Sequence, residues 1–152
     1  MTLKAKLRED LTESIRSKNE LRSSTIRMIL TAITNEEVSG KEARVLTDAE
    51  VITVLTREAK KRREAAEAFE SGGAKDRAER EKSEGEVIAQ YLPTQLSQDE
   101  LEALIAEAIT STGAQGPQGM GLVMKFLQPK VAGKADGATV SSAVKAALAS
   151  KS

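Results

Sequence analysis

Four lysines near the C-terminus are the residues whose type and spacing most clearly suggest a chemistry. Lys125 and Lys130 lie in one predicted helix, and Lys134 follows in a Gly-containing turn. Lys145 lies in the next predicted helix. Because a tight turn brings two helices side by side, these ammonium groups could meet one phosphate backbone and give affinity without reading bases. The pattern predicts binding of a polyanion.

The distribution of charge supports that prediction, although the formal net charge of the whole chain is zero. Residues 113–152 carry five lysines, the four above and Lys151, against the single acid Asp136, whereas residues 97–112 carry four acids and no base. Charge asymmetry of this kind favours a polyanionic partner for the basic part. A surface that only keeps the protein in solution explains the same counts, and both interpretations stay open.

The type of polyanion is indicated by the shortage of aromatic side chains, which make up 2% of the residues. Proteins that hold single strands stack bases on aromatic rings. A folded RNA that is recognised by its shape, such as a tRNA, therefore fits this composition better.

A second basic run consists of Lys60, Lys61, Arg62 and Arg63 in another predicted helix. Glutamates follow at favourable helical spacings, which would pair Lys60 with Glu64 and Arg63 with a glutamate four residues on. A solvated helix face with ion pairs is favoured here over a contact with RNA.

Catalytic, metal and cofactor sites are not indicated. The chain has no His and no Cys, so it lacks the commonest general acid–base and the thiolate ligands of zinc. The Gly-rich segment 113–119 lacks the Lys-Ser/Thr of a phosphate-binding loop, which favours an ordinary loop. The acids between residues 79 and 86 are dispersed along a helix, which favours solvation over a cation site.

The scaffold is predicted to be all-α because apolar residues recur at helical spacing along the chain. The first stripe is Leu3, Leu7, Leu11 and Ile15. Asn19 and Thr47 are expected to cap the second and third helices, and Thr47 with Glu50 has the form of a capping box. A fourth helix is expected over about residues 76–90, where Gly85 suggests a close helix contact.

The C-terminal part is predicted to contain three more helices. Ser97 with Glu100 has the form of a second capping box, Pro129 is expected to kink or end the sixth helix, and Asp136 is expected to cap the seventh. We therefore predict a four-helix domain over residues 1–92, a linker over 93–96 and a small three-helix domain over 97–152.

Location is predicted only from missing features. No run approaches the ~20 apolar residues of a membrane helix, and no signal peptide is visible at the N-terminus. A cytoplasmic protein with no membrane partner is the resulting expectation.

The motifs together are similar to a known family. The run GLVMKFLQPKVAGKADGATVSSAVKAAL over residues 121–148 resembles the C-terminal module of the GatB/YqeY family. That module also forms the tail of the B subunit of the glutamine-dependent aminoacyl-tRNA amidotransferase. The N-terminal half resembles YqeY-like proteins at four places, namely residues 27–28, 60–64, 81–86 and 91–97. Gly137 departs from the amidotransferase tail, which often has Pro there, so a looser helix start is expected.

The resemblance implies an all-α fold, tRNA as a partner, and a link to carbon–nitrogen ligation with glutamine as the amide donor. Amidotransferase subunits or an aminoacyl-tRNA synthetase are the protein partners that it suggests, and no cofactor is implied. No amidase or ATP site is visible, which favours an accessory over an autonomous enzyme. A non-catalytic adaptor that binds proteins through the charged third and fourth helices remains the alternative.

Overall fold

The chain is helical in the computed structural model, which describes residues 1–150. This range contains seven α-helices, one short 3-10 turn and no strand, so the all-α prediction is confirmed. Lys151 lies outside the described residues. Contacts divide the chain into two units, Met1–Leu92 and Pro93–Ser152, here called unit 1 and unit 2.

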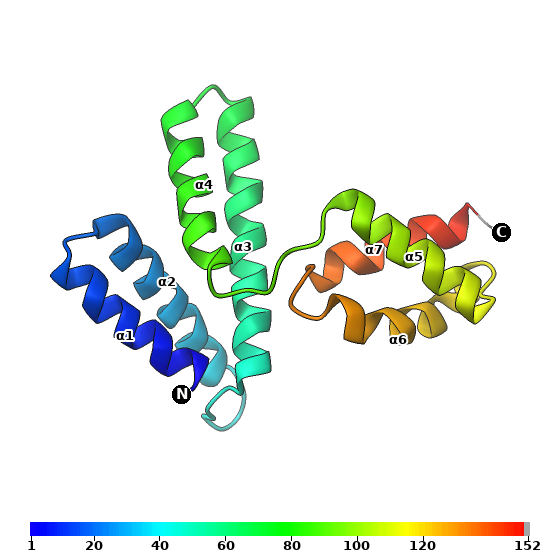
Figure 1. The fold of residues 1–152 in the computed structure, drawn as a ribbon, viewed down its shortest axis with the longest axis horizontal. Coiled ribbons are helices and arrows are strands. Elements are labelled where there is room, and N and C mark those ends of the chain that lie inside the picture. The colour runs from blue at the N-terminus through cyan, green and yellow to red at the C-terminus, as the bar shows by residue number, and fades with distance from the viewer. Residues whose placement is uncertain (151–152) are drawn as a thin grey trace. The chain divides into compact units, whose positions relative to one another are not determined.

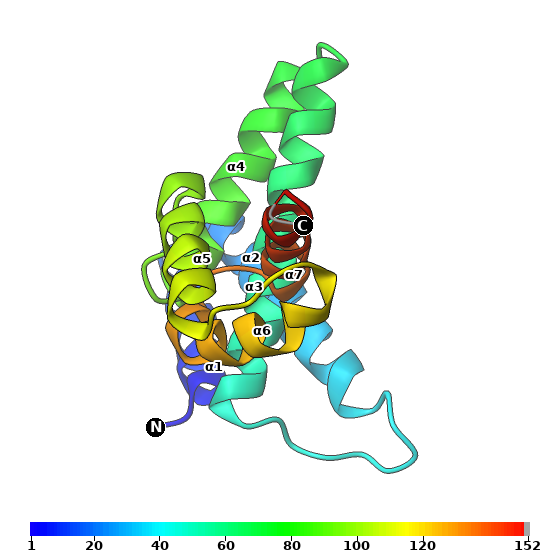
Figure 2. The ribbon, with the colours of Figure 1, turned by 90° about the vertical axis from the view of Figure 1, so that its right-hand side faces the viewer.

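Unit 1 consists of two helical hairpins (Figure 1). The first pairs α1 (Leu3–Arg16) with α2 (Glu20–Glu37), and the second pairs α3 (Asp48–Ser71) with α4 (Lys75–Ala89). Helix α2 packs against both α3 and α4, so it joins the two hairpins. Figure 2 shows the loop between α2 and α3 reaching away from these helices. The core side chains of unit 1 are mostly branched aliphatics, including Leu7, Ile26, Ile29, Ile33, Val51, Leu55 and Ile88.

Side-chain caps fix where several helices of unit 1 begin. The Asn19 side chain accepts a hydrogen bond from the Arg22 backbone N–H, which confirms the predicted cap of α2. Thr47 caps α3 in the same way, but the predicted capping box is only half formed. The Glu50 carboxylate instead pairs with Arg44 at 2.6 Å, because the loop before α3 brings that guanidinium close.

The predicted apolar stripe of α1 is wrong at its last position. Ile15 is 49% exposed, whereas the neighbouring Ser14 is buried. The Ser14 and Ser23 hydroxyl oxygens lie 2.8 Å apart between α1 and α2. These two small polar side chains occupy the seam in place of the isoleucine, so the inward face is shifted by one residue at this end of α1.

Polar clusters join the helices of unit 1. The Tyr91 hydroxyl donates to Asp10 of α1 at 2.5 Å and accepts from Arg22 of α2 at 3.1 Å. Burial, followed by the hydrogen bond to Asp10, raises the pKa of Tyr91 to about 12. Tyr91 stays protonated at neutral pH and links the end of α4 to the first hairpin.

Unit 2 contains α5 (Gln98–Thr112), the 3-10 turn η1 (Pro117–Gly119), α6 (Met120–Val131) and α7 (Gly137–Ala149). Each α-helix buries one apolar face, and the shared core includes Leu101, Ile105, Val123, Leu127, Val140, Val144 and Leu148. The Ser97–Glu100 capping box is complete, and Asp136 caps α7 through the Thr139 N–H, as predicted. Pro129 does not end α6, which continues to Val131.

The segment assigned to a linker is attached to unit 2. The Gln95 side-chain amide donates to the Gly133 carbonyl at 2.7 Å, and the Leu96 backbone N–H donates to the Lys134 carbonyl at 2.9 Å. Leu96 also packs against the core of unit 2.

Gly85 of α4 faces α3, and a substitution there shows whether the contact between the two helices requires a glycine. A Cβ at Gly85 would lie 3.7 Å from the Arg62 Cβ, an ordinary contact distance. Gly85→Ala should therefore raise the free energy of unfolding by up to ~1 kcal/mol through helix propensity. Gly113→Ala is the contrast, because φ is 69° there and alanine should destabilise. Chemical denaturation measures both, and a less stable Gly85→Ala would contradict the contact distance.

Glu37 gives unit 1 a pH-dependent contribution to stability. Its Oε1 accepts a 2.7 Å hydrogen bond from the Lys4 ammonium, and its Oε2 accepts one from the Leu46 N–H. These hydrogen bonds, that of Lys4 first, lower the pKa of Glu37 below its usual 4.5. The charged carboxylate therefore stabilises the fold above the usual pKa, and this contribution is lost as pH falls through the folded-state pKa.

We expect Glu37→Gln to be less stable than the wild type at about pH 7 and to approach it at about pH 3. Urea denaturation at the two pH values is the measurement. A difference in stability that stays constant between them would show that the charge of Glu37 contributes nothing.

Candidate nucleic-acid interface

The polar side of α6 carries the first predicted contact. Val123, Leu127 and Val131 are buried, whereas Lys125 is exposed. No described residue forms an ion pair with Lys125. Pro129 has no N–H to donate to the Lys125 carbonyl four residues earlier, so the proline also removes one backbone hydrogen bond at this point. The Lys125 ammonium is available to a partner.

Lys134 combines a fixed backbone with an exposed side chain. Gly133 has φ of 74°, which lets the chain reverse directly after α6. The Lys134 N–H donates to the Val131 carbonyl at 2.8 Å, and its carbonyl accepts from Leu96. The turn thus holds the base of this side chain in place while the ammonium stays in solvent.

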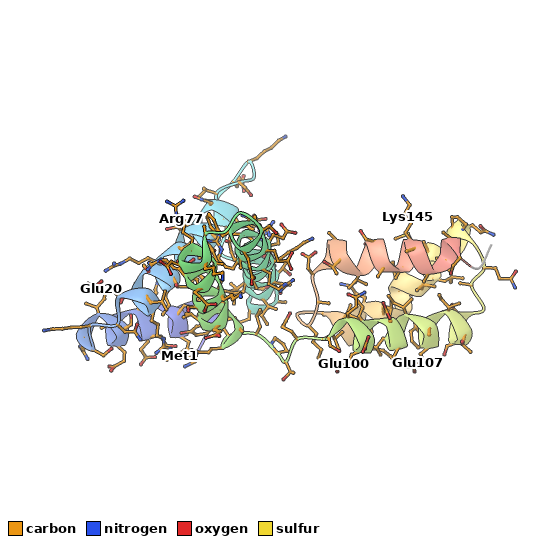
Figure 3. All side chains as sticks on the ribbon, turned by 90° about the horizontal axis from the view of Figure 1, so that it is seen from above. Met1, Glu20, Arg77, Glu100, Glu107 and Lys145 are labelled. Atoms are coloured by element: carbon orange, nitrogen blue, oxygen red, sulfur yellow. The ribbon has the colours of Figure 1, made fainter. Side chains whose placement is uncertain are left out.

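Lys145 and Lys130 occupy different environments. Lys145 is exposed on the side of α7 that faces away from α5, as Figure 3 shows. Lys130 instead reaches α5, where its ammonium lies 3.4 Å from Glu107. The same ammonium stands 4.5 Å from the centre of the Phe126 ring. Lys130 is therefore partly neutralised and holds α6 near α5, so it contributes less to a free basic surface than the other three.

The acids of unit 2 gather on α5. Glu100 and Glu107 lie on the α5 side of the unit, opposite Lys145 (Figure 3). Glu100 lies in the first turn of α5. Hydrogen bonding to the Ser97 backbone N–H, and to a smaller extent to the Ser97 side chain, lowers the pKa of Glu100. Asp136, the one acid in residues 113–152, is buried and used as a cap. None of the described acids forms an ion pair with Lys125, Lys134 or Lys145.

The glycines of the loop before α6 are required by the backbone conformation and the packing of that loop. Gly113 and Gly116 have positive φ. A Cβ at Gly119 would lie only 2.6 Å from the Ala114 Cβ. These glycines permit a turn and a close packing contact, which agrees with the ordinary-loop interpretation of the sequence.

The second basic run on α3 is largely engaged in ion pairs. Lys60 lies 3.9 Å from Glu64, as expected, and Lys61 lies 3.3 Å from Glu58. Arg62 is only 20% exposed and reaches across to α4. Arg63 is exposed, and the expected pair with the glutamate four residues on is not among the ion pairs of residues 1–150.

Arg62 is a bridge between helices. Its guanidinium lies 3.2 Å from Glu81 and 3.4 Å from Glu84, both on α4. Lys82 and Glu70 add another pair between the same two helices at 3.4 Å. Arg62 of α3 and Lys82 of α4 therefore join the two helices, and this surface is less suited to RNA than unit 2.

Sequence reasoning missed another basic group, in unit 1. Lys18, Arg27 and Arg80 line one pocket, although they come from the α1–α2 turn, α2 and α4. Within α2, the spacing of Glu20, Ser24 and Arg27 could have indicated a polar face. The approach of Arg80 depends on tertiary packing, which no local pattern predicts.

Residues 1–150 contain neither a cluster of metal ligands nor a helix suited to span a membrane. No three Asp or Glu side chains there are grouped as a metal ion would require. None of the described helices is both long enough and apolar enough to cross a membrane.

Comparison with known proteins identifies relatives in fungi. An uncharacterized protein of Schizosaccharomyces pombe is 35% identical over 95 residues, which cover 62% of this chain and 76% of the relative. Altered inheritance of mitochondria protein 41 of Lachancea thermotolerans is 30% identical, with 74% of this chain and 61% of the relative covered. The Candida glabrata protein of that name is 31% identical, with 57% and 47% covered. This chain thus spans about half of the Candida glabrata protein and about three fifths of the Lachancea thermotolerans protein.

The names of those relatives correct one expectation. Both Altered inheritance of mitochondria proteins are described as mitochondrial, which contradicts the predicted cytoplasmic location. The prediction was wrong because it rested on missing signals, and a missing signal does not distinguish one compartment from another.

The family itself is established over almost the whole chain. The family model of the Yqey-like protein matches residues 4–148, which span both units. This match agrees with the resemblance found in the motifs of both halves. The chain therefore belongs to the YqeY-like protein family.

Proposed function

We propose that this YqeY-like protein is an RNA-binding accessory whose unit 2 contacts the phosphate backbone of a folded RNA such as tRNA. The observation that carries the proposal is the separation of charge within unit 2. Lys125, Lys134 and Lys145 are exposed and form no ion pair among the described residues, while the acids of unit 2 other than the buried Asp136 lie on α5. Ammonium groups that form no ion pair within the protein are suited to replace the counterions of a phosphate backbone.

The chemistry of the side chains favours shape recognition. Lysine contacts phosphate as a point charge and carries no base specificity. Phe126 is half-buried and lies under Lys130, so it offers no stacking platform for a base. A folded RNA with closely spaced phosphates fits these groups better than an extended single strand.

The resemblance to the amidotransferase tail extends the proposal to a process. We infer that the chain assists glutamine-dependent amidation of aminoacyl-tRNA by holding the tRNA, with the amidotransferase subunits or an aminoacyl-tRNA synthetase as protein partners. An adaptor role for α3 and α4 is less well supported, because Arg62, Lys82 and their glutamate partners are used in pairs between the two helices.

The direct test is binding of an unmodified tRNA transcript to the full chain at several salt concentrations. Replacing Lys125, Lys134 and Lys145 together with Gln should weaken binding at low salt by at least about tenfold. The magnitude of the slope of log K against log salt should fall by about 2–3, since roughly three phosphate contacts are lost. All three side chains are exposed, so circular dichroism should show an unchanged fold.

The matched control replaces three exposed bases of unit 1, Arg16, Lys41 and Lys75, with Gln. Net charge then changes equally, and tRNA binding should stay near the wild-type value. Equal weakening in both variants would mean that only net charge matters, and absence of wild-type binding at low salt would refute the proposal. Added to an amidotransferase with misacylated tRNA, the wild type should raise amidation and the unit 2 variant should not.

A further inference from the structure

A pocket of about 520 Å³ lies in unit 1 beside the turn that joins α1 and α2. Its walls come from the end of α1, the turn itself, the first half of α2, and α4. Figure 3 labels Glu20, which lies at this turn and lines the pocket. The volume lies within the range of about 300–1,000 Å³ that small-molecule sites occupy.

Three basic side chains line this pocket against one acid, Glu20. Lys18 and Arg27 are exposed, and neither forms an ion pair within residues 1–150. The Nε of Arg80 lies 3.3 Å from Glu84, which anchors this guanidinium while its two terminal nitrogens have no partner among the described residues. Two guanidinium groups and an ammonium at one pocket are a donor set suited to a phosphate group.

The other walls of the pocket are of two kinds. Ser14 and Ser23 are buried and hydrogen-bonded to each other, and the Ser14 hydroxyl also donates to the Leu11 carbonyl. Both hydroxyl groups donate their hydrogen bonds within the protein, so the basic side chains are the groups that can bind a negatively charged ligand. Ile15, displaced from the core, offers an apolar surface beside them. The pocket thus combines a basic side with an apolar wall.

Lys18 has an unusual backbone conformation for a lysine. Its φ is 60°, and it is the one non-Gly residue with positive φ in the described part of the chain. The turn is closed by backbone hydrogen bonds, from the Lys18 N–H to Ile15 and from the Asn19 N–H to Ser14. Glycine would make the same turn with less strain, so the turn does not need the lysine side chain.

We propose that this pocket binds the phosphate group of a small phosphorylated molecule. Arg27, Arg80 and Lys18 hold the phosphate, and Ile15 contacts the organic part of the ligand. The site belongs to unit 1 and is separate from the RNA-binding surface proposed for unit 2.

The test is isothermal titration calorimetry of the full chain at low ionic strength with pyrophosphate, AMP and adenosine as probes. Pyrophosphate and AMP should each bind saturably at one site, and adenosine, which has no phosphate, should not bind. Lys18→Gly should weaken pyrophosphate binding by about tenfold or more while the melting temperature stays equal or rises. This combination separates a loss of ligand contact from a loss of folding, because the substitution relieves backbone strain.

Lys41→Gln is the matched control, since Lys41 is an exposed lysine of unit 1 outside the pocket. It should leave the affinity for pyrophosphate unchanged. The proposal is overturned if Lys18→Gly binds as the wild type does, or if Lys41→Gln weakens binding equally. Binding of tRNA at Lys18 and Arg27 with no saturable binding of pyrophosphate or AMP would also overturn it.

Discussion

Arg62 reaches from α3 to two glutamates of α4, and ion pairs of this kind between helices determine which bases of the chain remain available. Unit 1 uses several such pairs, including Lys4 with Glu37 and Arg22 with Asp10. A charge that is largely removed from water needs a partner nearby, because an unpaired charge in such a place destabilises the fold. Many of the bases of unit 1 are thus committed to its fold.

Unit 2 is held together differently. Its three helices share an aliphatic core, and Lys130 with Glu107 is the one ion pair between helices in its described part. Since the other lysines are not needed to join helices, they remain in solvent on α6, on α7 and in the turn between them. Positive charge that does not stabilise the fold is what a polyanion-binding surface requires.

Local features of the fold could be predicted because they depend on residues close in sequence. Asn19, Ser97 and Asp136 cap their helices through contacts three residues away, which a pattern reveals. Features that depend on tertiary packing could not. Ile15 has the right spacing for the core, but the paired serines of α1 and α2 displace it. Likewise, the Glu50 carboxylate forms an ion pair with Arg44 of the preceding loop and does not complete the capping box.

The candidate site likewise has features that the local sequence predicts and features that depend on tertiary packing. The sequence indicated the exposed lysines by type and spacing, but only the structure distinguishes Lys130, which pairs with α5, from Lys125, Lys134 and Lys145. Arg62 is part of the basic run on α3 and also contacts α4. The basic run alone does not reveal that the Arg62 side chain is mostly buried between the two helices. The pocket of Lys18, Arg27 and Arg80 was missed because three separate elements form it.

The most direct test of the proposed RNA surface is an NMR titration of the isotope-labelled full chain with tRNA. Shift changes and signal loss should concentrate at Lys125, at the turn around Lys134 and at Lys145, with little change along the outer face of α5. Changes that follow α5, or that are confined to unit 1, would contradict the proposed surface, as would the absence of any change at low salt.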